Sequence, residues 1–581
     1  MLKVEMGGDD QSTEGAELSH ESQYQQYYVN SYEFQLIYEA RKINPTLPIC
    51  VLPWTFPGWL GKTPYDNVTQ TAKYVVDWLK IGRSIYNFDT YCVGVWNERN
   101  FSEIYVKELR RQMNMEGFEK TKIVAGEGYQ MNDNYDRLID KEFINEYDII
   151  GVHYPGGMIP EKVQKTGKTI WASEDYSTDN RGTGEGCMAR IVNWNYVDGN
   201  ITGMLVWHIV SAFYPQIAWY RSGLSYLDEK EFKTEKAFNV LRMITGHVKP
   251  GWRILGNGNG SGRFEKGGTY VTYTNGKHMT IIVETTSYEK SLCEYSNPDR
   301  YYVSKKQKVI FELSGRFKYI DGLNISMNYE EPRYLKKKEG EGMKIEIWIE
   351  ENTFGILTTL PINIPNIDTI SIKQLSNIDY YDNFTDYKYG EEVRYWTPQK
   401  GSWIVENGIM KQNTIDIPIS WCTGNIHTPY TIMNSRWNNY DNIQLSLSFM
   451  IPSYSNASSV IIGFRSNCSG CDIGVTNCRG IFIEISLADN TVTISTDFVK
   501  RTELIKIGTF KRVSFDIWHN FKLILNARQF RINFEPFINV KEYTIPDDYF
   551  AKVEQDKLFV IATGSFGESF WDDMSIIKLS S

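Results

Sequence analysis

The sequence lacks several features that mark whole classes of proteins. No stretch reaches the roughly 18 consecutive apolar residues of a membrane-spanning helix; the longest candidate, residues 203–214, is shorter and contains His208. Internal repeats, low-complexity tracts and a glycine-rich nucleotide loop are absent as well. Positive charge is not in excess, because 62 Lys and Arg face 71 Asp and Glu, a net charge of −9. We therefore expect neither a membrane span nor a nucleic-acid partner.

A secretory signal peptide is not visible either. The chain opens with the letters MLKVEMGG, which are typical of a strand and not of a charged segment followed by an apolar one. We therefore expect that sequence upstream of Met1 is missing.

Cysteine is scarce, with eight residues in 581, too few for a disulfide-dense scaffold but enough for a few bridges. Cys468, Cys471 and Cys478 lie close together, but their segment contains no histidine and no evident fourth ligand, so zinc is not favoured there. The cysteines and eight glycosylation sequons together favour a secretory or lysosomal route. The sequons begin at Asn67, Asn100, Asn200, Asn259, Asn324, Asn383, Asn456 and Asn467.

The composition that is present is that of a large globular protein. A chain of 581 residues with 41% apolar and 23% charged residues exceeds the roughly 250–300 residues of one core, so two or three domains are expected. Aromatic residues make up 14% of the chain, including 38 Tyr and 16 Trp. Such a content suits carbohydrate binding, although β-rich proteins are aromatic for other reasons too.

Residues 1–230 alternate short apolar strands with amphipathic helical stretches, which predicts βα units and a parallel sheet. Seven strands are found, whereas a TIM barrel has eight, so we expect the first strand to precede Met1. The predicted strands are 2–5, 49–54, 91–96, 122–125, 149–154, 169–173 and 202–207, and the helical stretches include 31–42, 69–85, 102–114 and 186–198.

After residue 250 the pattern changes to strands and turns. Asn275-Gly276 between two apolar runs predicts a β-hairpin, and the strands up to about residue 360 predict a small β-sandwich. Alternating segments from 443 to 562 predict an all-β domain of jelly-roll or lectin type. The predicted domains are 1–250, 251–365 and 380–581, with a linker at 366–379.

Two glutamates at strand ends carry the chemistry. Counting the missing strand as the first, Glu98 follows the fourth strand and Glu174 follows the seventh, and catalytic side chains of TIM barrels lie at these ends. Glycoside hydrolysis needs one protonated carboxyl and one ionised carboxylate on opposite sides of the anomeric carbon. Asn97 can bind the sugar 2-hydroxyl. A single Glu at a strand end is often solvated surface, but the Asn-Glu pair with a second Glu favours catalysis.

Three nearby residues have two interpretations each. Trp54 and Trp207 are either ring platforms for a sugar or aromatics of the barrel core. His153 is either a site residue or a structural histidine. The sequence does not decide between these alternatives.

At these residues the chain resembles the galactocerebrosidase family, retaining glycoside hydrolases of the TIM-barrel clan. The resemblance is strong in the barrel and thin in the last 200 residues. It implies a barrel, a β-sandwich and a lectin domain, which together remove β-galactose from galactosylceramide-type lipids in the lysosome, with a saposin presenting the lipid. The motifs that carry it are 3–9 (KVEMGGD), 52–62 (LPWTFPGWLGK), 95–99 (VWNER), 151–156 (GVHYPG) and 172–178 (ASEDYST).

The resemblance also implies roles for individual residues. Glu98 matches the acid/base and Glu174 the nucleophile, and no cofactor is expected for catalysis. Cys187 and Cys293 match a disulfide that joins barrel to sandwich. Asp382 and Asp572 lie near the family's calcium site in the lectin domain. The residues that match sugar-contacting positions are Thr13, Trp54, Asn97 and Ser177, with Trp207 at the mouth.

Two residues depart from the family's pattern near the sugar. Trp219 stands where the family has a tyrosine, and Tyr295 stands where the family has an arginine. The leading hypothesis is a retaining β-galactosidase of glycolipids. A related β-glycosidase with another sugar specificity is the alternative, and a catalytically impaired carbohydrate-binding protein is a third, because the first strand is missing.

Overall fold

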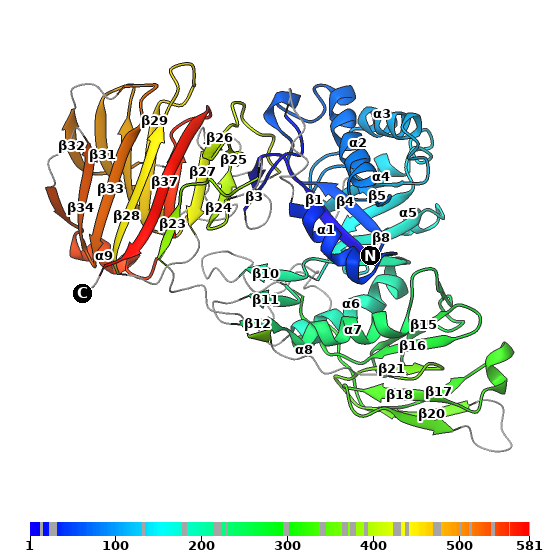
Figure 1. Cartoon of the computed structure of the whole chain (residues 1–581). Coiled ribbons are helices and arrows are strands. Elements are labelled where there is room, and N and C mark those ends of the chain that lie inside the picture. The colour runs from blue at the N-terminus through cyan, green and yellow to red at the C-terminus, as the bar shows by residue number, and fades with distance from the viewer. Residues whose placement is uncertain are drawn as a thin grey trace. The chain divides into compact units, whose positions relative to one another are not determined.

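The computed structural model forms two compact units, residues 1–123 with 374–581 and residues 124–373. In the first unit, helices and strands alternate in the N-terminal part, whereas the C-terminal domain consists mainly of strands (Figure 1). The described residues are 1–11, 15–22, 32–129, 134–176, 183–212, 223–227, 231–293, 301–336, 344–362, 370–371, 379–388, 393–421, 431–435, 441–468, 478–499, 501–509, 514–535, 541–556 and 558–579.

The first unit begins with three parallel strands, β1 (Leu2–Met6), β4 (Ile49–Pro53) and β5 (Thr90–Gly94). Strand β4 lies between the other two, and all five of its residues are buried, as expected of a strand inside a parallel sheet. Side-chain caps from Asn67 and Ser102 start the second and third helices. The helices are α1 (Tyr32–Ile43), α2 (Val68–Ser84) and α3 (Glu103–Met115).

The second unit continues the βα pattern with four parallel strands that pair in chain order. The seven parallel strands and their helices are those of a TIM-barrel domain, which confirms the predicted fold class. The strands are β6 (Lys122–Tyr129), β7 (Ile149–His153), β8 (Thr169–Asp175) and β9 (Gly203–Val206), and the helices are α4 (Tyr135–Leu138), α5 (Glu161–Gln164) and α6 (Gly184–Gly199).

An antiparallel β-sandwich follows in the same unit. The predicted hairpin is present, because β15 (Thr269–Thr274) pairs with β16 (Met279–Glu284) across Asn275-Gly276. The apolar core of the sandwich contains Ile281, Val283, Leu323 and Leu357. Its other elements are α7 (Lys236–His247), β13 (Arg253–Ile254), β14 (Gly262–Arg263), α8 (Tyr288–Ser291), β17 (Gln307–Glu312), β18 (Gly322–Met327), β19 (Arg333–Lys336), β20 (Lys344–Ile349) and β21 (Phe354–Thr358).

A small sheet in this unit was not predicted from the sequence. It consists of β10 (Val210–Ala212), β11 (Ser225–Leu227), β12 (Glu231–Thr234) and β22 (Ile370–Ser371). The first pair is parallel and the other two are antiparallel. Strands of two to four residues are too short to show the alternation by which a strand is recognised.

The C-terminal domain, in the first unit, packs two antiparallel sheets around one large apolar core that includes Trp403, Phe449, Phe534 and Trp571. This is the predicted lectin-like architecture. One sheet holds β23 (Tyr380–Asp382), β25 (Trp403–Glu406), β26 (Ile409–Gln412), β28 (Asn442–Met450), β33 (His519–Asn526), β34 (Gln529–Glu535), β35 (Lys541–Thr544) and β37 (Ser569–Lys578). The other holds β24 (Trp396–Lys400), β27 (Thr431–Ser435), β29 (Ser459–Ser466), β30 (Arg479–Ser486), β31 (Thr491–Asp497), β32 (Glu503–Thr509) and β36 (Leu558–Thr563).

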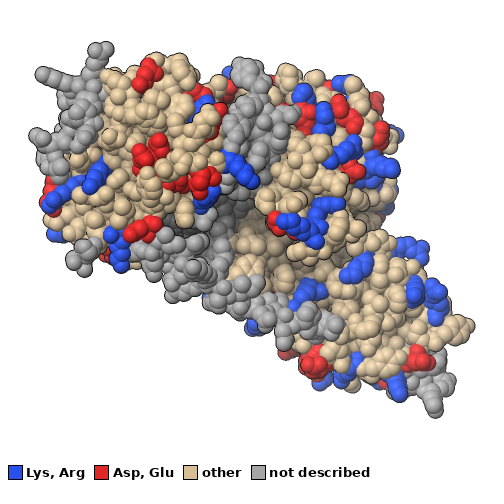
Figure 2. Space-filling view, in the orientation of Figure 1, with Lys and Arg blue, Asp and Glu red and all other residues tan. Residues whose placement is uncertain are grey.

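The predicted domain boundaries stay predictions, and most of the proposed linker 366–379 lies outside the described residues. On the face that Figure 2 shows, Lys and Arg side chains are interspersed with Asp and Glu side chains. None of the described helices is long and apolar enough to cross a membrane.

Candidate active site

Glu174 lies near the end of β8 and is 6% exposed. The hydroxyl of Tyr154 donates a 2.7 Å hydrogen bond to Glu174 Oε1. His153 Nδ1 lies 3.7 Å from Glu174 Oε2. Tyr154 adopts a positive φ of 49°, and its backbone N–H donates to the Glu174 carbonyl at 2.8 Å. The Tyr154 hydroxyl therefore orients the carboxylate, and the backbone hydrogen bond holds the part of β8 that carries it.

Glu98 and Asn97 follow β5 in the first unit. Glu98 is partly exposed and has a φ of +48°, while Asn97 is fully buried and its N–H donates to the Pro53 carbonyl at 2.9 Å. Among the described residues, neither side-chain atom of the Asn97 amide has a hydrogen-bond partner. A buried amide without a partner is costly in a folded protein. The amide thus has a free donor and a free acceptor, which a sugar hydroxyl can satisfy.

The rings of Trp54 and Trp421 are in contact just after β4. Trp54, directly after β4, is 4% exposed, and its carbonyl accepts a 3.0 Å hydrogen bond from Trp96 Nε1. The ring of Trp421 lies edge-on to the ring of Trp54, with centroids 4.5 Å apart. Trp421 comes from the C-terminal domain, and sequence reasoning did not single it out.

A backbone contact fixes the segment that carries Trp421. The N–H of Phe56 donates to the Ile419 carbonyl at 2.9 Å, and the N–H of Ile419 donates back to Phe56 at 2.7 Å. A Cβ on Gly58 would lie 2.4 Å from the carbonyl oxygen of Ile417, so glycine is needed for this close approach. The C-terminal domain is thus joined to the loop after β4.

Trp207 follows β9 and is half-buried. Its N–H donates to the Asp175 carbonyl at 2.9 Å, and its ring meets the ring of His208 edge-on at 4.2 Å. The Asp175 carboxylate accepts hydrogen bonds from Asn195 and from the N–H of Tyr176. Burial raises the pKa of Asp175, and these two donors oppose that rise.

Four predicted sugar-contacting residues lie outside the described residues, namely Thr13, Ser177, Trp219 and Tyr295. Their roles stay predictions. The structure describes the remaining predicted residues in two groups. Trp54, Asn97 and Glu98 belong to the first unit, and Glu174 and Trp207 belong to the second.

Comparison with known proteins identifies the family. The profile of glycosyl hydrolase family 59 matches residues 1–229, its central domain matches 257–360, and the galactocerebrosidase C-terminal lectin domain matches 399–579. A Caenorhabditis elegans relative is 56% identical over 575 residues, which cover 99% of this chain and 88% of the relative. The galactocerebrosidase of Homo sapiens is 33% identical over 514 residues, covering 84% and 73%.

The chain belongs to glycosyl hydrolase family 59. It is therefore a glycoside hydrolase, as the sequence predicts.

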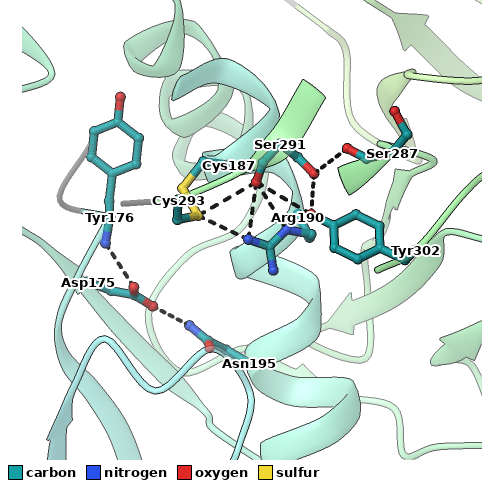
Figure 3. Close-up of a disulfide and its surroundings, with 9 residues drawn as sticks. All are labelled: Asp175, Tyr176, Cys187, Arg190, Asn195, Ser287, Ser291, Cys293 and Tyr302. Atoms are coloured by element: carbon teal, nitrogen blue, oxygen red, sulfur yellow. Dashed lines mark hydrogen bonds between the residues drawn. A yellow bond between two sulfur atoms is a disulfide. The ribbon is translucent and has the colours of Figure 1, made fainter. Parts of the chain in front are cut away.

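Cys187 and Cys293 form a disulfide in this family 59 chain, with Cα atoms 5.2 Å apart (Figure 3). Cys187 lies in α6 of the barrel, and Cys293 follows α8 of the sandwich. The guanidinium of Arg190 donates to the Ser291 carbonyl and to Cys293 Sγ, so the bridge and the arginine fix the same turn (Figure 3). Because the bridge joins a barrel helix to the sandwich, these two parts are covalently tied.

Among the described cysteines, two further bridges are present that were not predicted. Cys50 is bonded to Cys92 across the neighbouring strands β4 and β5, and Cys468 is bonded to Cys478. The second bridge removes two of the three cysteines that a zinc site there would need.

The proposed calcium ligands Asp382 and Asp572 lie on adjacent strands, β23 and β37. Asp382 already accepts hydrogen bonds from the Tyr380 and Tyr387 hydroxyls and from the N–H of Phe384. The pKa of Asp572 is raised, chiefly by burial and also by the charges of Asp573 and Asp382. Calcium takes six to eight oxygens. The two carboxylates fit a cation in charge, but by themselves they are too few.

Proposed function

We propose that this chain is a retaining β-galactosidase that hydrolyses galactosylceramide-like glycosphingolipids by double displacement. The unpartnered amide of Asn97, buried next to Glu98 at a strand end, is the observation that carries the proposal. Retaining barrel glycosidases use such an amide on the sugar 2-hydroxyl, where hydrogen bonds strengthen in the transition state.

The proposed mechanism gives the two glutamates separate roles. Glu98 protonates the leaving oxygen while Glu174 attacks the anomeric carbon and forms a glycosyl-enzyme. Glu98 then removes a proton from a water molecule. This water attacks the anomeric carbon of the glycosyl-enzyme, which frees Glu174 and releases the sugar with retained configuration. The surroundings of Glu174 support its role as the nucleophile, because the Tyr154 hydroxyl donates a hydrogen bond to its carboxylate and His153 Nδ1 lies 3.7 Å away, and a donor favours the ionised form of a carboxyl group.

The lipid substrate rests on the relatives. Those from dog and human are named galactocerebrosidases, and this chain covers most of their length. In this proposal a saposin-like protein presents the lipid galactoside in the lysosome or after secretion. No specific observation favours the alternatives, a β-glycosidase of another specificity or an impaired carbohydrate-binding protein.

NMR of the first-formed sugar from an aryl β-galactoside tests the mechanism. We expect the β-anomer first. Glu174→Gln should abolish turnover, whereas Glu98→Gln should retain activity on activated aryl galactosides, whose leaving group needs no proton, and lose activity on the lipid. Release of the α-anomer, or normal activity of Glu174→Gln, would refute the mechanism.

Comparison of sugars tests the substrate. We expect kcat/KM to be highest for the aryl β-galactoside, but discrimination against the β-glucoside should be about 10- to 100-fold lower than with an arginine at this position, because Tyr295 cannot offer the charge-assisted fork of an arginine. An aryl β-fucoside reports the contribution of the 6-hydroxyl. A tenfold preference for the glucoside would instead support the alternative β-glycosidase.

A further inference from the structure

A buried acid lies directly behind His153. Glu127, in the second half of β6, is 1% exposed and adopts a φ of +52°. The register of β6 against β7 shifts between Gly126 and Gly128, so the bulge turns this side chain inward. Its Oε2 accepts a 2.7 Å hydrogen bond from Ser173 Oγ and lies 2.9 Å from His153 Nε2.

The contacts define the protonation of the imidazole. An ionised Glu127 carboxylate only accepts hydrogen bonds, and with Glu127 in that state the 2.9 Å contact requires a proton on His153 Nε2. If the ring were neutral, Nδ1 would present a lone pair to Glu174 Oε2 at 3.7 Å, and the two would repel. A proton on Nδ1 as well makes both contacts attractive. The arrangement therefore fits an imidazolium between two carboxylates.

We propose that Glu127 and His153 form a buried charge pair that keeps the nucleophile Glu174 ionised and oriented. Both are positioning residues, and the proposal rests on the proposed role of Glu174. Glu127 supplies the counter-charge of His153, which an imidazolium with 0% exposure needs at every stage of the reaction.

The need for Glu127 is greatest in the middle of the reaction. When Glu174 becomes an ester of the sugar, its negative charge disappears. Without Glu127, a fully buried imidazolium would then have lost its partner and would release its proton. With Glu127 in place, His153 stays charged and is ready to stabilise the carboxylate when water frees it.

Within the second unit, titratable groups with established contacts to this pair come from three strands or their ends. Glu127 comes from β6, and Tyr154 follows β7 and donates to Glu174. Glu174 and Asp175 come from β8, and the charge of His153 lowers the pKa of Asp175. One cationic ring thus acts on a set of acids in the second unit.

The test uses the acid limb of the pH profile of kcat/KM for 4-nitrophenyl β-galactoside. This limb reports ionisation of the nucleophile in the free enzyme. In Glu127→Gln, His153 should lose its counter-charge and with it its proton, so Glu174 no longer has a cation beside it. We therefore expect the midpoint of the acid limb to rise by about one to two pH units, because a nearby opposite charge lowers a carboxyl pKa by about one to three units. His153→Gln should raise it similarly, and the double variant should add little further.

Glu284→Gln is the matched control. Glu284 is a carboxylate of the same unit with 0% exposure, and it accepts hydrogen bonds from Thr269 and Thr286 of the sandwich and from Trp194 of α6. We expect this variant to lose stability without moving the acid limb. An unmoved limb in folded Glu127→Gln and His153→Gln overturns the proposal.

A second measurement needs no variant. In wild-type protein labelled with ¹⁵N-histidine, we expect one of the seven histidines to keep the imidazolium signature at pH 8. His20 and His208 cannot produce it, because burial lowers their pKa values to about 3 and about 4. Absence of an imidazolium at pH 8 overturns the proposal.

The proposed function is checked separately. A 2-deoxy-2-fluoro-β-galactosyl fluoride should label Glu174 in the wild type, as detected by peptide mass spectrometry. Lack of labelling at Glu174 would count against the role of the nucleophile, whatever the pH limb does. If Glu174 is labelled but the acid limb of the variants does not move, only the proposal of the charge pair is refuted.

Discussion

The substitution Asp9→Asn should flatten the dependence of stability on pH. Asp9 follows β1, is 9% exposed and has a φ of +67°. Its Oδ1 accepts a 2.8 Å hydrogen bond from the N–H of Ser19. Burial raises the pKa of this carboxyl to about 6, and the neighbouring charge of Asp10 adds to the rise. Asparagine keeps the acceptor oxygen and tolerates the positive φ, but it does not titrate.

The direction in which stability changes with pH follows from proton binding. Because the pKa is higher in the folded state, the folded protein keeps a proton between about pH 4 and 6 that the unfolded chain releases. The contribution to stability is fully present below pH 4 and is lost as pH rises through about 6. A shift from 3.8 to about 6 corresponds to roughly 3 kcal/mol, at about 1.4 kcal/mol per unit.

The assay is the unfolding midpoint, Tm, by scanning calorimetry at pH 4.5, 5.5, 6.5 and 7.5. At roughly 2 °C per kcal/mol for a large domain, wild type should lose up to about 6 °C more than Asp9→Asn between the lowest and highest pH. Asp89→Asn, at an exposed carboxylate paired with Arg83, is the matched control and should follow wild type. Parallel curves for wild type and Asp9→Asn would refute the reasoning.

Three other perturbations address the bridge, the tryptophan pair and calcium. Replacing Cys187 and Cys293 by serine opens a link across 106 residues and should lower the free energy of unfolding by about 4–5 kcal/mol, which calorimetry measures; an unchanged Tm would contradict this. Trp421→Ala removes an edge-on ring contact with Trp54 of about 0.5–1.5 kcal/mol, so KM for an aryl galactoside should rise about 2- to 10-fold, while Trp421→Phe should stay near wild type. If calcium binds at Asp382, EGTA should lower the Tm of wild type but not of Asp382→Asn; equal responses would exclude that site.

The strand-end positions of the two candidate glutamates depend on local pattern and were predictable. Glu98 lies just after one apolar strand and Glu174 near the end of another, and chain order alone assigns those strands to the barrel. The hairpin at Asn275-Gly276 was also predictable, because that dipeptide adopts the positive φ values of a tight turn, and Gly276 has a φ of +83°. In each case residues adjacent in sequence determine the result.

Glu127 and Trp421 could not be found in this way. The predicted strand ended at Ala125, because two glycines and an acid interrupt the apolar run, but β6 continues to Tyr129 through a bulge. A buried acid in a bulge looks like a loop residue in sequence. Trp421 is a candidate site residue only because the C-terminal domain contacts the chain just after β4. The contacting residues are more than 300 positions apart, and no sequence periodicity indicates such a contact.

Buried polar contacts join the C-terminal domain to the barrel strands of the first unit. Lys400 Nζ lies 3.5 Å from Asp10 Oδ2, and the two side chains are 2% and 0% exposed. The N–H of the next residue, Gly401, donates to the Asp9 carbonyl at 2.9 Å. A buried ion pair adds little net stability, but removing one partner leaves an uncompensated charge and costs about 3–5 kcal/mol. Its role is therefore to define one docked arrangement. Because Asp9 and Asp10 lie just beyond β1, the lectin-like domain helps to hold the chain at the C-terminal end of that barrel strand.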